Sequence, residues 1–361
     1  MFFGNDAMLG DRLKGRDNNF NLMRFIAAIA VLIGHCYPLA LGVGAEEPLS
    51  HSLGQSLGGF AVDTFFIISG FLVTQSLLYR ESVGAFLIAR LLRIYPGLIV
   101  MVVLTVFVLG PLVTTVSLRE YREAPLTLSY LLKCSTLIGG LRFQLPGVFE
   151  GNPFALKVNG SLWTMPYEVK MYLWLVGLWW VLGVRPSLRG RLFAFGIKGI
   201  ALYAVFMVSK AFIWGHEVTP FLRLTAAFSL GSAMYLLKDR IPVSGGLLVL
   251  ALAFFGLSMF RKSFFMWVYL PLMPYLVLSL ATVPGGFIRR FNRLGDYSYG
   301  IYIYAFPIQQ TLAMAYPGIT PVEMMPLAAA FSLLFGIVSW HLVESPCLRL
   351  KRSQSPAPHG S

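Results

Sequence analysis

The chain has few charged residues. Asp, Glu, Lys and Arg make up only 12% of its 361 residues, whereas 57% are apolar. A soluble globular protein has roughly 25% charged residues, so the composition excludes an ordinary soluble enzyme. Because apolar runs extend from one end of the chain to the other, the unit that organises it is a membrane span of about 20 residues.

Cysteine, histidine and acidic residues are also scarce. Three widely separated cysteines form neither a disulfide framework nor a metal cluster, and five scattered histidines lack the spacing of a zinc site. The sequence therefore predicts no metal site. Sixteen acidic residues against 29 Lys and Arg leave the chain basic. In a membrane protein this excess indicates cytoplasmic loops, and we expect no nucleic-acid partner.

The apolar runs predict an all-α polytopic membrane protein with about ten transmembrane helices. They cover residues 19–39, 59–79, 97–115, 166–183, 192–213, 221–237, 244–260, 264–283, 297–316 and 326–343. The first run contains an arginine and lacks a small-residue cleavage site, so it is a retained span and not a signal peptide. Eighteen of the basic residues lie on the side of the N-terminus and seven on the opposite side. The positive-inside rule therefore predicts that both termini are cytoplasmic.

Three regions follow from this topology. Residues 1–18 are a cytoplasmic N-terminal segment, residues 19–345 a membrane domain, and residues 346–361 a cytoplasmic tail whose composition predicts disorder. The longest loop, residues 116–165, faces outward. It is rich in aromatic and aliphatic residues, so we expect it to pack against the mouth of the helix bundle.

Charged side chains inside spans are costly and need a partner or a task. In the first span, Arg24 and His35 lie eleven positions apart, which places both on one face of a helix with about 16 Å between them. A cation near the inner boundary and an imidazole near the outer one suit a long anionic molecule that enters from the cytoplasm. The alternative is that Arg24 reaches lipid headgroups and His35 is an interfacial histidine bound to a loop.

Two carboxylates are expected at the depth of His35. Asp63, near the outer end of the second span, would orient and stabilise the imidazole, or would be a helix N-terminal carboxylate favoured by the macrodipole. Glu168 enters the fourth span from outside, where Trp163 and Tyr167 mark the membrane interface.

Other features lie along the same helices. Arg90 and Arg93, at the cytoplasmic start of the third span, share a face and form a good phosphate clamp, although headgroup binding is an alternative. Ser69 and Gly70 indicate close helix packing rather than a nucleophile. Glu344 ends the tenth span on the inner side, and we expect it to pair with an arginine there.

Taken together and in this order, six motifs resemble those of the acyltransferase-3 family, the multi-span O-acyltransferases that modify bacterial surface glycans and some other acceptors. The resemblance covers most of the chain. The motifs are Phe-Asn-Leu-Met-Arg24 followed by His35, Val-Asp63-Thr-Phe-Phe-Ile-Ile-Ser-Gly-Phe, Arg90-x-x-Arg93-Ile-Tyr-Pro, Ser161-Leu-Trp-Thr followed by Glu168, Gly295-Asp-Tyr-Ser-Tyr-Gly-Ile-Tyr, and Val-Glu344-Ser-Pro.

The resemblance implies an enzyme of the bacterial cytoplasmic (inner) membrane. It would move an acyl group, usually acetyl from cytoplasmic acetyl-CoA, to a hydroxyl of a surface or lipid-linked glycan such as lipopolysaccharide O-antigen or exopolysaccharide. Acyl-CoA would be the donor substrate, the lipid bilayer and the glycan the other partners, and no cofactor would be permanently bound.

The resemblance also assigns roles by position. Arg24 and His35 match the essential pair of the family, with Glu168 and Asp63 as further catalytic candidates. An imidazole can act as general base on the acceptor hydroxyl or take the acyl group itself. The acyl-CoA is assigned to three arginines, Arg24, Arg90 and Arg93, and the acceptor to Trp163 and Tyr167.

Two other functions compete with acyl transfer. Ten spans with buried charges also suit a transporter or exporter of a glycan or anionic solute, which would have discontinuous helices in two related halves. A non-catalytic assembly or sensing protein that kept the fold is the third possibility. The resemblance to the family is not complete. Many relatives have an arginine where this chain has Ala89 and a histidine where it has Ala305. Any role that those residues have in the relatives therefore does not transfer to this chain.

Overall fold

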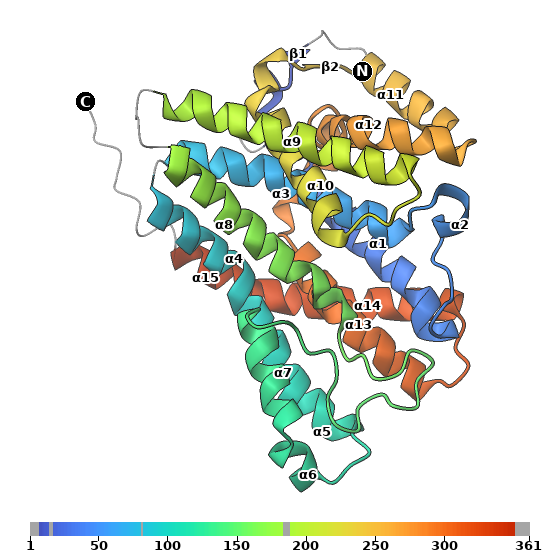
Figure 1. Ribbon diagram of the computed structural model, residues 1–361. Coiled ribbons are helices and arrows are strands. Elements are labelled where there is room, and N and C mark those ends of the chain that lie inside the picture. The colour runs from blue at the N-terminus through green and yellow to red at the C-terminus, as the bar shows by residue number, and fades with distance from the viewer. Residues whose placement is uncertain (1–6, 14–16, 81, 183–187, 351–361) are drawn as a thin grey trace. The chain divides into compact units, whose positions relative to one another are not determined.

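The computed structural model describes residues 7–13, 17–80, 82–182 and 188–350 (Figure 1). In this part of the chain, ten helices each overlap one predicted apolar run. They are α1 (Phe20–Leu41), α3 (Leu57–Arg80), α4 (Val83–Leu104), α8 (Met165–Val181), α9 (Arg189–Ile213), α10 (Pro220–Leu236), α11 (Gly245–Ser258), α12 (Lys262–Thr282), α13 (Ser298–Ala315) and α14 (Pro321–Ser339).

Among the described residues, six helices are long and apolar enough to cross a membrane. They are Phe20–Leu41, Leu57–Tyr79, Val83–Val113, Arg189–Ile213, Lys262–Thr282 and Pro321–Leu350. Two of the other four, α8 and α10, have 17 residues each, about 25 Å at 1.5 Å per residue. The all-α polytopic class is thus confirmed, whereas the count of ten spans and the cytoplasmic termini stay predictions.

Shorter elements complete the described chain. They are α2 (Ser50–Leu53), α5 (Gly110–Val113), α6 (Leu118–Glu123), α7 (Pro125–Thr136), α15 (Ser345–Leu350) and one antiparallel pair of two-residue strands, β1 (Ala7–Met8) and β2 (Pro242–Val243). π-Helical turns at Thr105–Leu109 and Trp340–Glu344 extend α4 and α14.

The predicted disordered tail begins with the helix α15, so residues 346–350 are helical. The π-helical turn carries the chain from α14 into α15 without a break. The remainder of the predicted tail, residues 351–361, lies outside the described residues.

The chain forms two compact units. Unit 1 comprises Met1–Val31, Glu47–Glu81 and Tyr167–Asp296, and unit 2 comprises Leu32–Glu46, Ser82–Pro166 and Tyr297–Ser361. Helix α1 therefore contributes its first half to unit 1 and its second half to unit 2.

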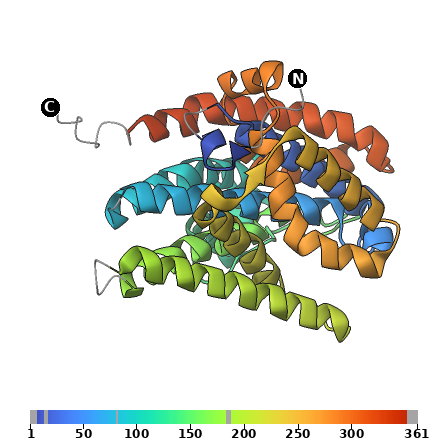
Figure 2. The same cartoon turned by 90° about the horizontal axis from the view of Figure 1, so that it is seen from above.

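In unit 1, α10 packs against both α3 and α9 (Figures 1 and 2). The contact between α3 and α10 depends on glycine. A Cβ atom on Gly70 would lie 1.9 Å from the carbonyl oxygen of Phe228, and one on Gly231 would lie 2.1 Å from that of Ile67. The Ser232 hydroxyl donates to the Gly70 carbonyl across the same contact at 3.1 Å. The predicted packing role of Gly70 is confirmed.

In unit 2, α13 lies against α14, where a Cβ on Gly300 would be 2.7 Å from the Cα of Gly336. The loop predicted over residues 116–165 folds onto this unit through α6, α7 and buried side chains. The Tyr121 hydroxyl donates to the Val106 carbonyl within the π-helical turn at 2.9 Å. Asn152, also from this loop, donates to the Gln310 carbonyl of α13 at 2.8 Å. The loop is thus an ordered part of the unit.

Candidate functional site

His35 lies on the part of α1 that belongs to unit 2, and its side chain is half-buried. Its Nδ1 is 3.5 Å from the Ser161 hydroxyl oxygen. The ring of Phe306 meets the imidazole edge to face, with centroids 5.4 Å apart. The Ser161 hydroxyl can accept from Nδ1–H or donate to an unprotonated Nδ1, so the contact fits either neutral tautomer of the imidazole.

The segment that carries Ser161 is bound to α13. It forms the 3-10 helix Gly160–Thr164. The Tyr302 hydroxyl donates to the Ser161 carbonyl at 2.8 Å and lies 2.6 Å from the Thr164 hydroxyl. Just before this helix, the Asn159 amide donates to the Ile303 carbonyl at 2.8 Å. Two motifs far apart in the sequence, around Ser161 and Tyr302, are therefore joined beside His35.

Arg24 lies on the part of α1 that belongs to unit 1. Its Nη2 is 2.9 Å from Oδ2 of Asp296, and side-chain exposures of 26% and 11% show that the pair is largely removed from water. One turn earlier, the Asn21 amide donates to the Gly295 carbonyl at 2.7 Å. The sequence did not indicate Asp296 as the partner of Arg24, although Asp296 lies in the motif Gly295-Asp-Tyr-Ser. Its position in that motif was the one feature of the sequence that could have pointed to Asp296.

Asp63 is buried in unit 1 with three polar partners. Arg223 places its Nε 3.2 Å from Oδ1, while the Tyr269 hydroxyl and the Gln55 amide donate to Oδ2 at 2.5 and 3.1 Å. Arg223 also donates to the Gln55 side-chain oxygen at 3.1 Å. Helix α3 begins at Leu57, so Asp63 lies beyond its first turn.

The macrodipole interpretation of Asp63 is therefore wrong, because that effect fades within the first turn of a helix. The ion pair with Arg223 explains how the carboxylate is tolerated in an apolar helix. Its orienting action on His35 stays a prediction, since the two residues belong to different units.

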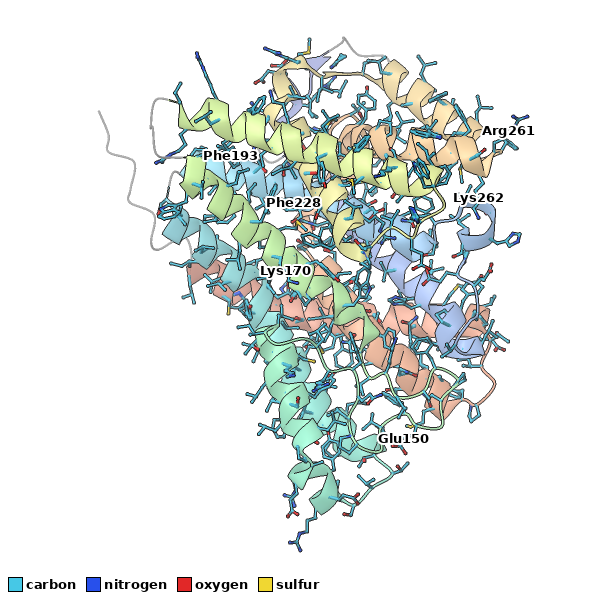
Figure 3. All side chains as sticks on the ribbon, viewed as in Figure 1. Glu150, Lys170, Phe193, Phe228, Arg261 and Lys262 are labelled. Carbon is cyan, nitrogen blue, oxygen red and sulfur yellow. The ribbon has the colours of Figure 1, made fainter. Side chains whose placement is uncertain are left out.

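Glu168 accepts a hydrogen bond from the Tyr172 hydroxyl one turn further along α8. The Tyr172 hydroxyl is also 3.2 Å from that of Ser69 on α3. Ser69 thus supports the carboxylate through the tyrosine, a contact that the sequence did not predict. Lys170, labelled on α8 in Figure 3, is exposed and places its ammonium 5.4 Å from the ring centroid of Tyr167.

The two residues assigned to the acceptor fall in different units. Trp163 is half-buried in the Gly160–Thr164 helix of unit 2. Tyr167, at the start of α8 in unit 1, has its ring 6.3 Å from that of Phe221. Their shared contact with a glycan stays a prediction.

Arg90 and Arg93 both lie within α4. Arg93 places its Nη1 3.3 Å from Oε2 of Glu344 and its guanidinium 5.5 Å from the Tyr299 ring centroid. Glu344 is only 1% exposed, and its other oxygen accepts from the Ser339 hydroxyl at 2.9 Å. The prediction that Glu344 pairs with an arginine is confirmed.

The described ranges contain no group of three or more His, Cys, Asp or Glu side chains placed to hold a metal ion. The described residues bring together an imidazole, three largely buried arginine–carboxylate pairs and a tyrosine-supported glutamate. Together with the apolar helices, these groups define a polytopic membrane protein with buried polar machinery.

Comparison with known sequences gives the family. The acyltransferase-3 model, described as an acyltransferase domain, matches residues 17–341, and the chain belongs to this family. It is 30% identical over 342 residues to an O-acetyl transferase of Shigella phage Sf6, covering 91% of this chain and 95% of the relative. It is 28% identical to nodulation protein 10 of Rhizobium leguminosarum bv. viciae, covering 94% and 95%. No solved structure matches the chain.

Proposed function

We propose that this acyltransferase moves an acetyl group from cytoplasmic acetyl-CoA to a hydroxyl of a cell-surface glycan, such as lipopolysaccharide O-antigen or exopolysaccharide, in the bacterial inner membrane. The family match supports acyl transfer, and the name of the phage relative supports acetyl as the group and oxygen as its acceptor. The glycan acceptor rests on the resemblance of the motifs.

His35 carries the proposal. It lies on the same helix as Arg24, and its imidazole is beside the buried hydroxyl of Ser161. If Ser161 accepts from Nδ1–H, the lone pair of Nε2 is available as a base. The base takes the proton of the acceptor hydroxyl, the oxygen forms a bond to the thioester carbonyl carbon, and the carbon–sulfur bond breaks. The imidazolium returns the proton to the leaving coenzyme A thiolate.

Arginines and carboxylates support this chemistry. Arg24, Arg90 and Arg93 bind the phosphates of the donor, since guanidinium groups match phosphate geometry. Glu168 and Asp63 serve as further polar groups of the reaction site.

Trp163 and Tyr167 contact the acceptor, because aromatic side chains offer flat apolar faces with a polar edge.

The experiment compares surface glycans from a deletion strain that carries the native protein, His35→Ala or His51→Ala at matched membrane levels. His51 is an exposed histidine of α2 and serves as the control. Removing a general base costs about 10²- to 10⁴-fold in rate. Mass spectrometry of alkali-released acids should therefore find acetate with the native and His51→Ala proteins and at most about one hundredth of it with His35→Ala. Equal acetylation by His35→Ala would refute the imidazole mechanism.

A different result would identify another function. If the native protein adds no alkali-labile group to any surface glycan, the acceptor assignment fails. Uptake of a glycan or anionic solute into vesicles without any acyl donor would then favour transport.

A further inference from the structure

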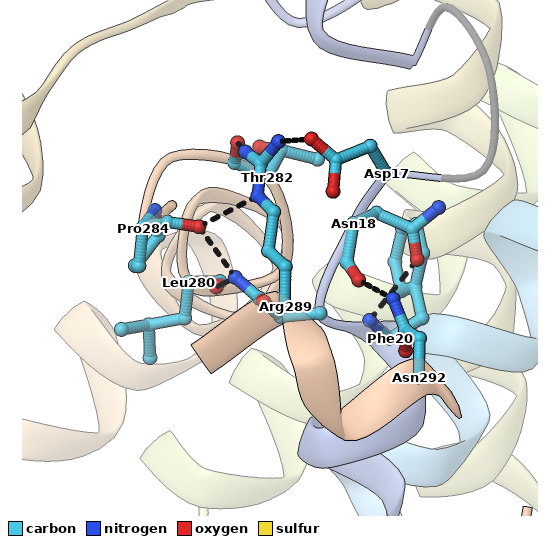
Figure 4. A network of polar contacts seen from close by, with 9 residues as sticks. Asp17, Asn18, Phe20, Leu280, Thr282, Pro284, Arg289 and Asn292 are labelled. Carbon is cyan, nitrogen blue, oxygen red and sulfur yellow. Dashed lines mark hydrogen bonds and ion pairs between the residues drawn. The ribbon is translucent and has the colours of Figure 1, made fainter. Parts of the chain in front are cut away.

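The start of α1 is tied to the segment between α12 and α13 by a series of polar contacts in unit 1 (Figure 4). We call these contacts the α1 clasp. Arg289 pairs with Asp17, and Asn292 donates to the Asn18 carbonyl. The Asn19 amide donates to the Pro284 carbonyl at 2.8 Å. Because Asn19 is 2% exposed, water cannot replace this contact.

The clasp continues along α1 to Arg24. Phe25 meets the ring of Phe291 at 5.2 Å, Asn21 bonds to the Gly295 carbonyl, and Asp296 pairs with Arg24. Gly295 has a φ of 110°, a conformation that favours glycine and turns the chain just before Asp296. The clasp therefore fixes the backbone on both sides of the Arg24–Asp296 pair.

This arrangement fixes the position of the Arg24 guanidinium, which is proposed to bind the acyl-CoA donor. A guanidinium has five N–H donors, so an ion pair at Nη2 is compatible with binding a phosphate through other donors. A flexible arginine loses side-chain entropy when it binds, whereas one already held by a carboxylate has lost part of it beforehand. A nearby carboxylate also lets the charge sit in an apolar helix.

We propose that Asp296 is a positioning residue for Arg24, which it holds so that the guanidinium meets a phosphate of acyl-CoA. This inference rests on the proposed function. Asp296 does not touch the reacting atoms. It acts through Arg24, and the contacts that Asn19 and Asn21 make with backbone carbonyls hold the backbone that carries it.

The test measures coenzyme A affinity of the full-length protein in detergent, from the ligand-dependent rise of its melting temperature. Asp296→Asn keeps the shape of the side chain and removes its charge, and we expect it to weaken coenzyme A binding about tenfold, a typical coupling between residues in contact. Asp17→Asn is the matched control, because it removes the other clasp carboxylate, which is 70% exposed and pairs with Arg289. It should keep the native affinity.

A double-mutant cycle shows whether Asp296 acts through Arg24. Arg24→Gln with Asp296→Asn should bind coenzyme A no more weakly than Arg24→Gln alone. Additive losses, equal losses in Asp296→Asn and Asp17→Asn, or tighter binding by Asp296→Asn would each overturn the inference. The last result would mean that the carboxylate competes with phosphate.

Failure of the proposed function gives a different pattern. If the native protein does not respond to coenzyme A, the donor assignment fails, and the same cycle is then measured from the acyl content of the glycan. Non-additive losses there support the Arg24–Asp296 coupling with another donor, and additive losses refute it.

Discussion

The contact between α3 and α10 predicts a specific loss of stability and activity on the substitution Gly70→Ala. The added Cβ would lie 1.9 Å from the Phe228 carbonyl oxygen, whereas real Cβ contacts are essentially never under 3.0 Å. The two helix backbones must therefore separate by about 1 Å, since a carbonyl oxygen within a helix cannot rotate away.

Three terms set the magnitude. Overpacking of a well-packed contact costs about 1–3 kcal/mol, and weakening of the Ser232 hydrogen bond to the Gly70 carbonyl costs about 1 kcal/mol more. Alanine recovers up to about 1 kcal/mol of helix propensity. We expect a net loss of about 1–4 kcal/mol, which lowers the melting temperature by roughly 2–16 °C at about 2–4 °C per kcal/mol.

The assay is thermal unfolding of the purified protein in detergent, followed by acetyl transfer at matched protein levels. Gly177→Ala on α8 is the control, because a Cβ there meets nothing within 4 Å. It should leave the melting temperature unchanged or raised. Activity of Gly70→Ala should also fall, since the neighbouring Ser69 supports Glu168 through Tyr172. Equal melting temperatures for the two variants would refute the close contact.

Three further predictions follow from the buried polar groups. Arg93→Gln leaves the carboxylate of Glu344 buried without its arginine and should destabilise the protein by about 3 kcal/mol; adding Glu344→Gln should recover most of the melting temperature, and a double variant no more stable than Arg93→Gln would contradict the pairing. Tyr269→Phe removes a hydrogen-bond donor from Asp63 and should cost about 2 kcal/mol in thermal unfolding; an unchanged melting temperature would show that this bond contributes nothing. Burial raises the pKa of the Cys134 thiol to about 11, and the thiol is 0% exposed, so in the folded protein it should resist alkylation by iodoacetamide from pH 7 to pH 10; rapid alkylation of Cys134 at pH 9 would indicate an accessible, ordinary thiol.

Asp63 and Glu344 each have buried ion-pair and hydrogen-bond partners that stabilise the fold. Each is nearly fully buried, with an arginine as its ion-pair partner and hydroxyl or amide donors on its oxygens. Replacement of either is therefore expected to lower protein levels as well as activity. Variants of His35, which is half-buried, give the cleaner test of the reaction.

The helices were largely predictable from the sequence, because a run of about 20 apolar residues is a local property. The third span shows where the prediction of helix bounds from apolar runs fails. The predicted run covers residues 97–115, but the helix extends over Val83–Val113. Arg90 and Arg93 lower the local hydropathy and so end the predicted run. They do not interrupt backbone hydrogen bonding, since arginine is a good helix former.

The partners of the charged residues were not predictable. Glu344 was expected to pair with an arginine, and its partner Arg93 lies 251 positions away. Many arginines of the chain offer the same charge, so only the packing of α4 against the π-helical turn selects this one. Asp296 was given no role in the sequence analysis for the same reason: its sequence motif could be recognised, but its arginine partner could not.

The sequence by itself determined that this is a helical membrane protein with Arg24 and His35 on one helix, because composition and spacing along a regular helix need no tertiary information. Only the tertiary structure decided which groups surround those residues. Ion pairs and hydrogen bonds depend on distances of a few ångströms between segments far apart in the chain, and such distances are set by helix packing. Asp296 beside Arg24 and Ser161 beside His35 are the two contacts that this packing added.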